Sequence, residues 1–439
     1  MRRAARGPGA LLMYETFSRT KSVCPVCFRT IDAEKAVAGD GFVHLIKTCP
    51  EHGLFDALIW EGGAEEYLAW GGAPAGGGAD DGCPNNCGLC AGHKSEGCCI
   101  LLELTHRCNL RCPVCFASAG GEGDLGLDEI ARLYDMLMAR GGPFNIQLSG
   151  GEPTMRGDLP EIVRLGRERG FTFFQLNTNG LRLASEDGYA EELREAGVSC
   201  AFLQFDGLRP ETYARLRGRD LAAEKLRAID SCAAAGLPVV LVPTLVPGVN
   251  VDEVGGILRF ALGRGKAVRG VHFQPVSYFG RCELPEPETR LTIPRVIREI
   301  EAQTGGAMKF ADFGGGGAES PWCSFHASYR KLPGGGLKAL PRRESACCCK
   351  KSSEARDFVA GRWGAEAGPA AEEDGFDRFL REALENTFTV SGMAFMDADS
   401  LDLERLRRCY ICEADAERGM VPFCAYNLTA RDGRALYRK

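Results

Sequence analysis

Residues 100–116 read ILLELTHRCNLRCPVCF, and this stretch decides the fold. The apolar run 100–105 predicts a buried β-strand, and three cysteines follow it in a C-x3-C-x2-C spacing: Cys108, Cys112 and Cys115. Three thiolates can hold three irons of a [4Fe–4S] cluster and leave the fourth iron open to an outside ligand. A zinc knuckle is the alternative, because C-x2-C alone also occurs in zinc sites.

An apolar run followed by an amphipathic stretch occurs six times between residues 100 and 305. The later runs are FNIQLSG (144–150), FTFFQLNTNG (171–180), CAFLQFDG (200–207), PVVLVPTLVPG (238–248) and VRGVHFQPVSY (268–278). Most of the helix-like segments between them end at glycine, as helices commonly do. Successive βα units with apolar strands predict an α/β fold with a parallel sheet. We expect a partial (β/α)6 TIM-type barrel whose site lies at the carboxyl ends of the strands.

Composition divides the chain into four segments. Residues 1–70 hold three cysteines and predict an N-terminal metal-binding module of the rubredoxin or zinc-ribbon type. Residues 71–99 combine a glycine-rich linker with a second cysteine group. Residues 100–305 form the predicted barrel. The less regular residues 306–439 predict an irregular C-terminal iron–sulfur module that also binds substrate.

The overall composition excludes several classes of function. The 439 residues are 45% hydrophobic and 26% charged with a net charge of -6, which is typical of a soluble globular protein and gives no basic surface for nucleic acid. No apolar stretch reaches the ~18 residues of a membrane span, and no signal peptide is evident. We therefore expect a cytoplasmic protein, with peripheral membrane contact left open. In a reducing cytosol, 21 cysteines predict metal ligation rather than disulfides.

Two further motifs accompany the cysteine loop. The second run ends in SGGEPT (149–154) and the third in LNTNG (176–180), where a barrel presents its ligand contacts. With Phe116 after the last cysteine, these motifs resemble the radical S-adenosylmethionine (SAM) superfamily. The resemblance implies that SAM chelates the open iron and is cleaved to a 5′-deoxyadenosyl radical, which attacks an unactivated C–H bond. It also implies an electron donor such as ferredoxin or flavodoxin.

The same resemblance implies which residues bind SAM. The GGEP segment would contact the amino group, two asparagines the ribose or carboxylate, and side chains of the fifth and sixth runs the adenine. The predicted contacts are Gly150, Gly151, Glu152, Pro153, Asn177, Asn179, Val242, Thr244, His272 and Gln274. Capping or turn hydrogen bonds are the alternative role for Asn177, Asn179 and His272.

Three cysteines near the N-terminus predict a mononuclear metal site. Cys24 and Cys27 stand in a C-x2-C spacing, and Cys49 follows in CPEHG. The spacing allows either zinc or iron. His52 and a cysteine of the next group are both candidates for the fourth ligand, and the rubredoxin-like site that the resemblance implies favours a cysteine.

Two more cysteine groups predict one or two auxiliary [4Fe–4S] clusters, with zinc as the alternative. The first group has four thiols, the number that saturates a cubane: Cys83, Cys87, Cys90 and Cys98. The second combines three C-terminal cysteines with a distant fourth: Cys409, Cys412, Cys424 and Cys323. In this group the resemblance rests on Cys409 and Cys424, so that Cys412 can be a bystander.

The ordered motifs narrow the resemblance. They are similar to the subgroup of archaeal tetraether lipid synthase and the class D radical SAM methyltransferases of 6-hydroxymethyl-7,8-dihydropterin; examples are CPNNCGLC, SGGEPT, LQFDG, HFQPVSYFGR and VPFCAYN. The leading expectation is C–C bond formation on lipid alkyl chains. The alternatives are C-methylation of a pterin precursor, an iron–sulfur peptide maturase, and a non-enzymatic iron–sulfur carrier or scaffold. A long apolar channel would favour lipid, and a small polar pocket a pterin.

Overall fold

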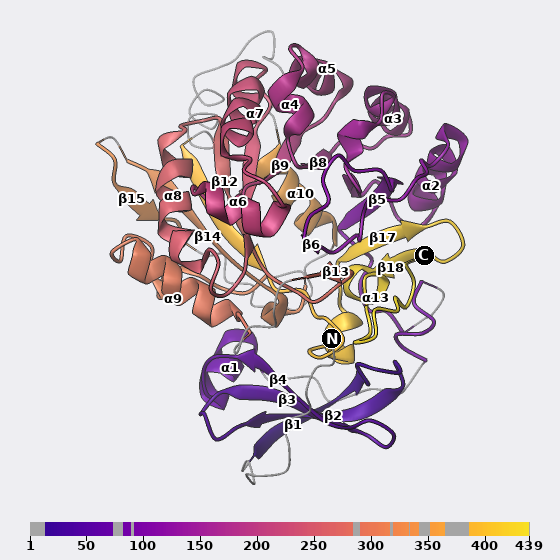
Figure 1. Ribbon diagram of the computed structural model, residues 1–439, viewed down its shortest axis with the longest axis vertical. Coiled ribbons are helices and arrows are strands. Elements are labelled where there is room, and N and C mark those ends of the chain that lie inside the picture. Colours follow the sequence, from indigo (N-terminus) through magenta and orange to yellow (C-terminus); the bar gives the residue numbers. More distant parts are fainter. Residues whose placement is uncertain are drawn as a thin grey trace.

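The centre of the protein is a parallel sheet, drawn in Figure 1 from a computed structural model. The structure describes residues 14–72, 82–88, 92–283, 290–316, 319–332, 334–341, 352–364 and 386–438. Successive strands of the sheet are neighbours and run parallel: β5 (Cys99–Thr105), β7 (Asn145–Gly150), β8 (Phe174–Thr178), β9 (Cys200–Gln204), β10 (Val239–Val242) and β12 (Val268–Pro275). The predicted α/β fold with six parallel strands is confirmed.

We call these six parallel strands the parallel core. Amphipathic helices cover its outer face (Figure 1). In α3, for example, Leu159, Ile162 and Val163 share one helical face and are fully buried. The helices are α2 (Leu127–Ala139), α3 (Leu159–Glu168), α4 (Leu181–Ser185), α5 (Tyr189–Ala196), α6 (Pro210–Arg217), α7 (Ala222–Ala234), α8 (Val254–Gly263) and α9 (Ile293–Gln303). Across the described ranges, we find no helix with the length and apolar character needed to cross a bilayer.

The C-terminal segment is more regular than predicted, because it extends the parallel core at both edges. Beside β12 lie β16 (Thr387–Met393), β14 (Ser324–Lys331) and β15 (Leu337–Ala339). Beside β5 lie β17 (Ile411–Asp415) and β18 (Gly419–Pro422). Both edges of the parallel core are thereby paired with further strands. Among the described strands, the two ends of the sheet, β15 and β18, do not pair with each other.

Helix α10 (Ser352–Trp363) lies at the amino ends of the core strands. Its Trp363 packs in one buried cluster with Phe173, Cys200 and Val240, which stand at or near the first residues of β8, β9 and β10. Helix α10 therefore closes one end of the space that the strands surround. The remaining short elements are β6 (Val114–Cys115), β11 (Thr244–Leu245), β13 (Arg281–Cys282), α12 (Leu403–Leu406) and α13 (Phe423–Tyr426).

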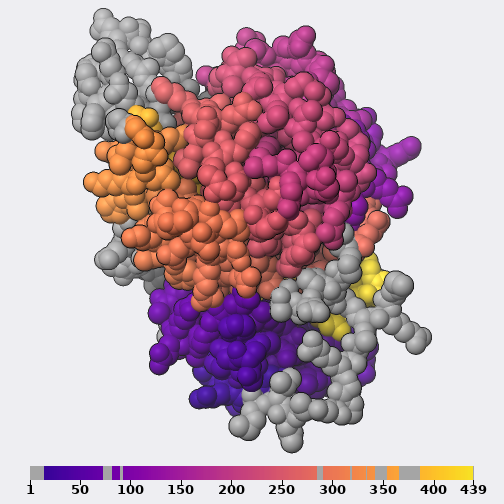
Figure 2. Space-filling model, turned by 60° about the vertical axis from the view of Figure 1, so that its left-hand side comes forward, coloured from indigo at the N-terminus to yellow at the C-terminus, as the bar shows by residue number. Residues whose placement is uncertain are grey.

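The N-terminal segment is a separate antiparallel sheet that packs on the rest of the chain. Its elements are β1 (Glu15–Val23), β2 (Thr30–Val37), β3 (Val43–Cys49), β4 (Gly53–Trp60) and α1 (Ala64–Gly71). Figure 2 shows this segment, in indigo, directly against the orange region that includes α9. Arg298 of α9 donates to the carbonyl oxygen of Glu61 at 2.6 Å and pairs with Glu66 at 3.0 Å.

A buried ion pair joins this N-terminal sheet to the C-terminal segment. Lys35 Nζ lies 2.7 Å from Asp402, and both side chains are only 3% exposed. Around this pair, Ser22 donates to the carbonyl oxygen of Leu401 at 2.5 Å and Lys47 to that of Ala398 at 2.7 Å. The contact is buried and polar, so each of the two charges is compensated by the other and not by water.

Replacing Asp402 with alanine is expected to lower the free energy of unfolding by about 3–5 kcal/mol, because Lys35 would remain buried without its partner. Urea denaturation measures the loss. The matched control is Asp432→Ala, whose ion pair with Arg434 is exposed and should change stability by less than about 1 kcal/mol. Equal losses in the two variants would show that the buried pair does not join the segments.

Candidate functional site

A cavity of about 2180 Å³ lies inside the parallel core. Cys108, Cys112 and Cys115 line it at one end, and residues of α10 line it at the other. The N-terminal sheet also reaches it, through Lys35 and through Trp70 of α1. The cavity is therefore built by all parts of the described chain.

The three cysteines of the opening motif come together in the loop after β5. They gather in one cluster with the buried Leu110 and Tyr213. The loop is fixed from both sides: Arg107 pairs with Asp124 at 2.5 Å, and Arg281 Nε donates to the carbonyl oxygen of Cys112 at 2.8 Å. Three soft thiols facing a cavity fit a cluster with one open iron.

Burial raises the pKa of the Cys108 thiol to about 12. Burial also raises the pKa of the Cys112 thiol, although the neighbouring Arg217 lowers it in part. Binding of iron must therefore displace protons from this loop.

The GGEP turn packs directly against the cysteine loop. Gly150 has a φ of 118°, which favours glycine, and a Cβ on Gly151 would collide with the carbonyl oxygen of Arg107. Glu152 is only 2% exposed. Its carboxylate accepts hydrogen bonds from the backbone and hydroxyl of Thr154 (3.2 and 2.7 Å), the hydroxyl of Thr178 (2.6 Å) and the backbone N–H of Asn179 (2.7 Å). The carboxylate is thus already bound by the protein.

Asn179 connects the third strand to the cysteine loop. Its side-chain amide donates to Asn109 Oδ1 at 2.7 Å, and its carbonyl oxygen accepts from Lys225 Nζ at 2.5 Å. Burial lowers the pKa of Lys225 to about 8. Asn177 lines the cavity and donates to Gln147 Oε1 at 3.2 Å. The two predicted asparagines therefore both reach the site, with their amides partly engaged by the protein.

Three cavity residues that sequence reasoning missed are carboxamides on successive strands: Gln147, Gln175 and Gln204. Each has an apolar residue on either side within its run, and that was the available signal, because a strand buried on both faces rarely holds amides. Their side chains point to the interior of the parallel core.

A buried ion pair that sequence reasoning also missed supports the far side of the cysteine loop. Arg217 forms two 2.6 Å contacts with Asp206, and the side chains are 5% and 0% exposed. Arg217 also donates to the carbonyl oxygen of Val114 and to the hydroxyl of Thr244, both at 3.0 Å. Thr244 is thereby committed to Arg217, while Val242 lines the cavity.

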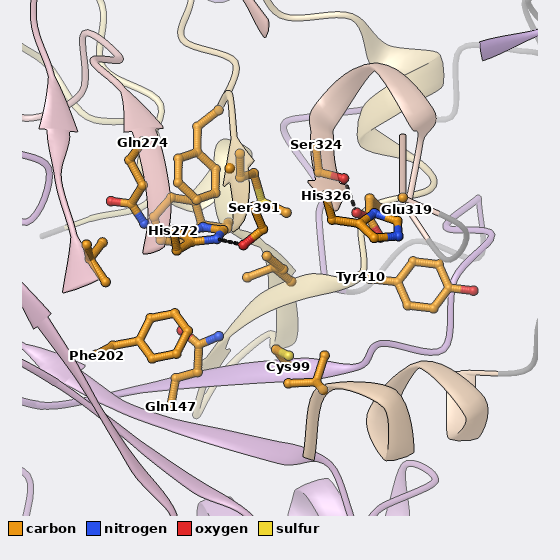
Figure 3. A pocket seen from close by; sticks show the side chains of 18 of the residues that line it. Cys99, Gln147, Phe202, His272, Gln274, Glu319, Ser324, His326, Ser391 and Tyr410 are labelled. Carbon is orange, nitrogen blue, oxygen red and sulfur yellow. Dashed lines mark hydrogen bonds between the residues drawn. The ribbon is translucent and has the colours of Figure 1, made fainter. Parts of the chain in front are cut away.

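His272 and Gln274 lie on the cavity wall formed by β12. His272 Nδ1 is 2.9 Å from the hydroxyl of Ser391 on β16, as Figure 3 shows. Burial lowers the pKa of His272 to about 4, so its imidazole is neutral at physiological pH. The side-chain amide of Gln274 faces the cavity and has no hydrogen-bond partner among the described residues.

The N-terminal cysteines form a compact metal site at the end of the antiparallel sheet. Cys24 and Cys27 come from the β1–β2 turn, Cys49 and His52 from the β3–β4 turn, and their ligand atoms all lie within 4.8 Å of one another. His52 Nδ1 is 3.4 Å from Cys49 Sγ and 3.6 Å from Cys24 Sγ. The structure places His52 beside the three thiols, because the two turns face each other, so that His52 could serve as the fourth ligand. Three thiols and one imidazole fit tetrahedral zinc.

Replacing His52 with alanine is expected to weaken zinc binding by more than the ~10- to 100-fold that loss of an outer hydrogen-bond partner costs. Competition with a chromogenic chelator measures the affinity. His44→Ala is the control, because His44 lies on the same sheet but pairs with Asp40 and Asp56. Unchanged zinc affinity in the His52 variant would exclude it as a ligand.

The C-terminal cysteines divide into two sets. Burial raises the pKa of Cys409 to about 12, with Cys323 contributing, and the pKa of Cys424 is raised by burial and by the same two thiols. Cys409 therefore lies near Cys323 and Cys424, and it also lies near Cys412, whose pKa it raises. Cys412 packs instead in the main core beside β5, and the adjacent Ile411 is the residue that lines the cavity. The alternation of strand side chains thus directs Cys412 away from the cavity.

The cysteines of the second segment are also separated. Cys83 and Cys87 pack in a buried cluster with Phe28 and Phe423, near the hydroxyl of Tyr437. Cys98 lines the cavity, with its thiol 3.7 Å from that of Cys99. Cys90 lies outside the described residues.

Comparison with known proteins gives matches in two regions. Residues 102–261 match the family described as the radical SAM superfamily, and residues 16–61 match an HMPTM N-terminal zinc ribbon domain. A 7,8-dihydro-6-hydroxymethylpterin dimethyltransferase of Methanocaldococcus jannaschii is 42% identical over 67% of this chain and 60% of its own length. A GTP 3′,8-cyclase of Erythrobacter litoralis is 32% identical over 48% of this chain and 67% of its own length.

Solved structures are more distant. Streptococcus suis SuiB bound to the precursor peptide SuiA has a TM-score of 0.41 and 13% identity over 48% of this chain and 45% of that chain.

The chain spans 60% of the length of the pterin dimethyltransferase that it resembles, which is less than two thirds.

Proposed function

Because the chain belongs to the radical SAM superfamily, we propose that it is a radical SAM C-methyltransferase acting on a pterin-like heterocycle. The methyl carbon would come from a one-carbon donor separate from the SAM that is cleaved to the radical, and the electrons from the external reductant. The cavity as a whole is neither small nor uniformly polar, and one part of its wall carries this proposal. There the strands present uncharged hydrogen-bonding side chains at mid-strand positions, which suit a polar heterocycle better than an alkyl chain. The similarity to a pterin dimethyltransferase also favours a pterin-like substrate over the lipid alkyl chains that are the leading expectation from the sequence.

The energetic argument concerns what a bound substrate would do to these groups. The uncharged polar residues that line the cavity from the core strands and β16 include Gln147, Ser149, Gln175, Asn177, Gln204, His272, Gln274 and Ser391. An alkyl chain would strip them of water without replacing its hydrogen bonds, at a cost of about 1–3 kcal/mol for each group left unpaired. A heterocycle with ring N–H and carbonyl groups would satisfy them instead.

The residues around the cysteine loop have assignable tasks in this function. Cys108, Cys112 and Cys115 would hold the [4Fe–4S] cluster, and the GGEP backbone would receive the SAM amino group. The chemistry that the bound cluster and SAM would supply here is a carbon radical able to abstract hydrogen from an unactivated C–H bond. Asn179 and Arg217 fix the loop from opposite sides, and Trp363 closes the floor against water.

A second cluster behind the cavity wall is part of the proposal. Cys323 acts electrostatically on both Cys409 and Cys424, and Tyr410 and Phe423, their neighbours in the sequence, line the cavity. Three neighbouring thiols fit an auxiliary [4Fe–4S] cluster that exchanges electrons with the substrate side. Cys83 and Cys87, with Cys90, would form another cluster. An external one-electron donor such as ferredoxin or flavodoxin would reduce the enzyme.

The test compares substrates for their ability to stimulate 5′-deoxyadenosine formation. The anaerobically reconstituted enzyme is incubated with SAM, a strong reductant and either 6-hydroxymethyl-7,8-dihydropterin or an isoprenoid diether lipid in detergent. We expect the pterin to raise the rate well above the substrate-free reaction, and the lipid to leave it unchanged. Stimulation by the lipid alone would overturn the proposal.

A further inference from the structure

Three neighbouring strands place a row of polar side chains on one wall of the cavity. In the sheet, His272 of β12 is paired with Ser391 of β16, and Ser391 with His326 of β14. Residues directly opposite on adjacent strands point to the same face, and all three line the cavity. Figure 3 shows them in the same part of the cavity as Phe202 and Gln147.

The depth of this row separates it from the predicted SAM contacts. The cysteine loop, the GGEP turn and Asn179 follow the carboxyl ends of β5, β7 and β8. His272 and Gln147 each stand three residues before the end of their strand, which is roughly 10 Å deeper along it. Phe202 and Ser391 stand two residues before the ends of β9 and β16. The cavity therefore has an upper layer, formed by the loops after the strands, and a lower layer, formed by side chains from within the strands. Barrel interiors are commonly layered in this way.

Two groups of the lower layer keep a hydrogen-bonding atom free while the rest of the side chain is fixed. The hydroxyl of Ser391 lies 2.9 Å from Nδ1 of His272, and Nε2 of His272 has no hydrogen-bond partner among the described residues. Asn177 holds Gln147 through Oε1 at 3.2 Å, and Nε2 of Gln147 is likewise unpartnered among the described residues. The ring of Phe202 lies 5.9 Å from that of His272. Preorganised polar atoms beside an aromatic face are suited to a flat ring with a polar edge.

We infer that His272 and Gln147 bind the hydrogen-bonding edge of the heterocyclic substrate, that its ring lies against Phe202, and that Ser391 is the positioning residue for His272. This inference rests on the pterin-like substrate proposed above. It moves His272 from the predicted adenine site of SAM to the substrate. A neutral imidazole suits this role, because it offers one donor or acceptor without the penalty of burying a charge.

The test measures binding of 6-hydroxymethyl-7,8-dihydropterin and of SAM to the reconstituted enzyme by anaerobic calorimetry. His272→Phe should weaken pterin binding about 10- to 100-fold, and by far more than it weakens SAM binding. His272→Gln retains a polar group and should lose less, which separates lost recognition from misfolding. Ser391→Ala should raise KM for the pterin more than it lowers kcat, and Ser391→Thr should restore it. Ser328→Ala is the matched control, because its hydroxyl bonds Thr389 two residues farther along the same wall.

The outcomes distinguish this inference from the proposed function. Wild-type protein that binds the pterin, with a His272→Phe variant that binds it equally well, overturns the inference alone. Loss of SAM binding in that variant, with pterin binding kept, returns His272 to the cofactor site and also overturns it. Wild-type protein that binds no pterin overturns the proposed function, and the inference with it.

Discussion

Simultaneous replacement of Cys108, Cys112 and Cys115 with alanine is expected to abolish 5′-deoxyadenosine formation. The three thiols are the ones that the loop after β5 directs into the cavity, and a cluster with one open iron has no further protein ligand. Anaerobic reconstitution followed by chromatography of the nucleoside products measures the loss. Zinc at the N-terminal site should be retained in full, because Cys24, Cys27, Cys49 and His52 lie in a separate sheet.

The control for this variant is Cys232→Ala, which removes a fully buried thiol from the core beneath α7. It should lower stability modestly and leave cluster content unchanged, because a buried cysteine without a metal acts as a small apolar residue. Nucleoside formation at the wild-type rate by the triple variant would remove the basis for a radical SAM site in this loop.

Replacement of Glu152 with alanine is expected to lower the free energy of unfolding by at least about 3 kcal/mol and to weaken SAM binding at the same time. The residue type and position in GGEP suggested a direct contact with SAM. The structure shows a carboxylate that already accepts four hydrogen bonds, from Thr154, Thr178 and Asn179. Its removal leaves buried donors unpaired and frees Asn179, which holds the cysteine loop through Asn109.

Thermal or urea unfolding and SAM titration of the same preparations separate the two effects. Glu152→Gln keeps the shape and one oxygen acceptor, so that it should fall between wild type and alanine in both measurements. A variant with wild-type stability and no SAM affinity would show that the carboxylate itself contacts SAM.

The parallel core could be predicted because its signals are local. Each strand is a continuous apolar run, since both faces are buried, and each run ends at the residues that reach the cavity. The three cysteines and the GGEP turn could be placed for the same reason, because loops after parallel strands meet at one edge of the sheet. The cavity lining was predictable in part. A glutamine inside an apolar run, as in FNIQLSG, signals a polar interior, whereas nothing near Ser391 marks it as a partner of His272.

The remaining features depend on contacts between distant segments. Strands β16 and β17 take their places by pairing with β12 and β5, far away in the sequence. His52 lies beside the three N-terminal thiols because the β1–β2 and β3–β4 turns face each other, which spacing cannot reveal. Cys412 has the spacing of a ligand, but its place on β17 turns it into the core.

The fate of a substrate hydrogen atom tests the central claim most directly. 6-Hydroxymethyl-7,8-dihydropterin deuterated at its sp3 carbons is incubated with the reconstituted enzyme, unlabelled SAM and a strong reductant, and the 5′-deoxyadenosine is analysed by mass spectrometry. The account predicts 5′-deoxyadenosine that carries deuterium, because the carbon radical made in this cavity takes its hydrogen from the pterin. Formation of 5′-deoxyadenosine without deuterium, at a rate that the pterin does not change, would contradict it.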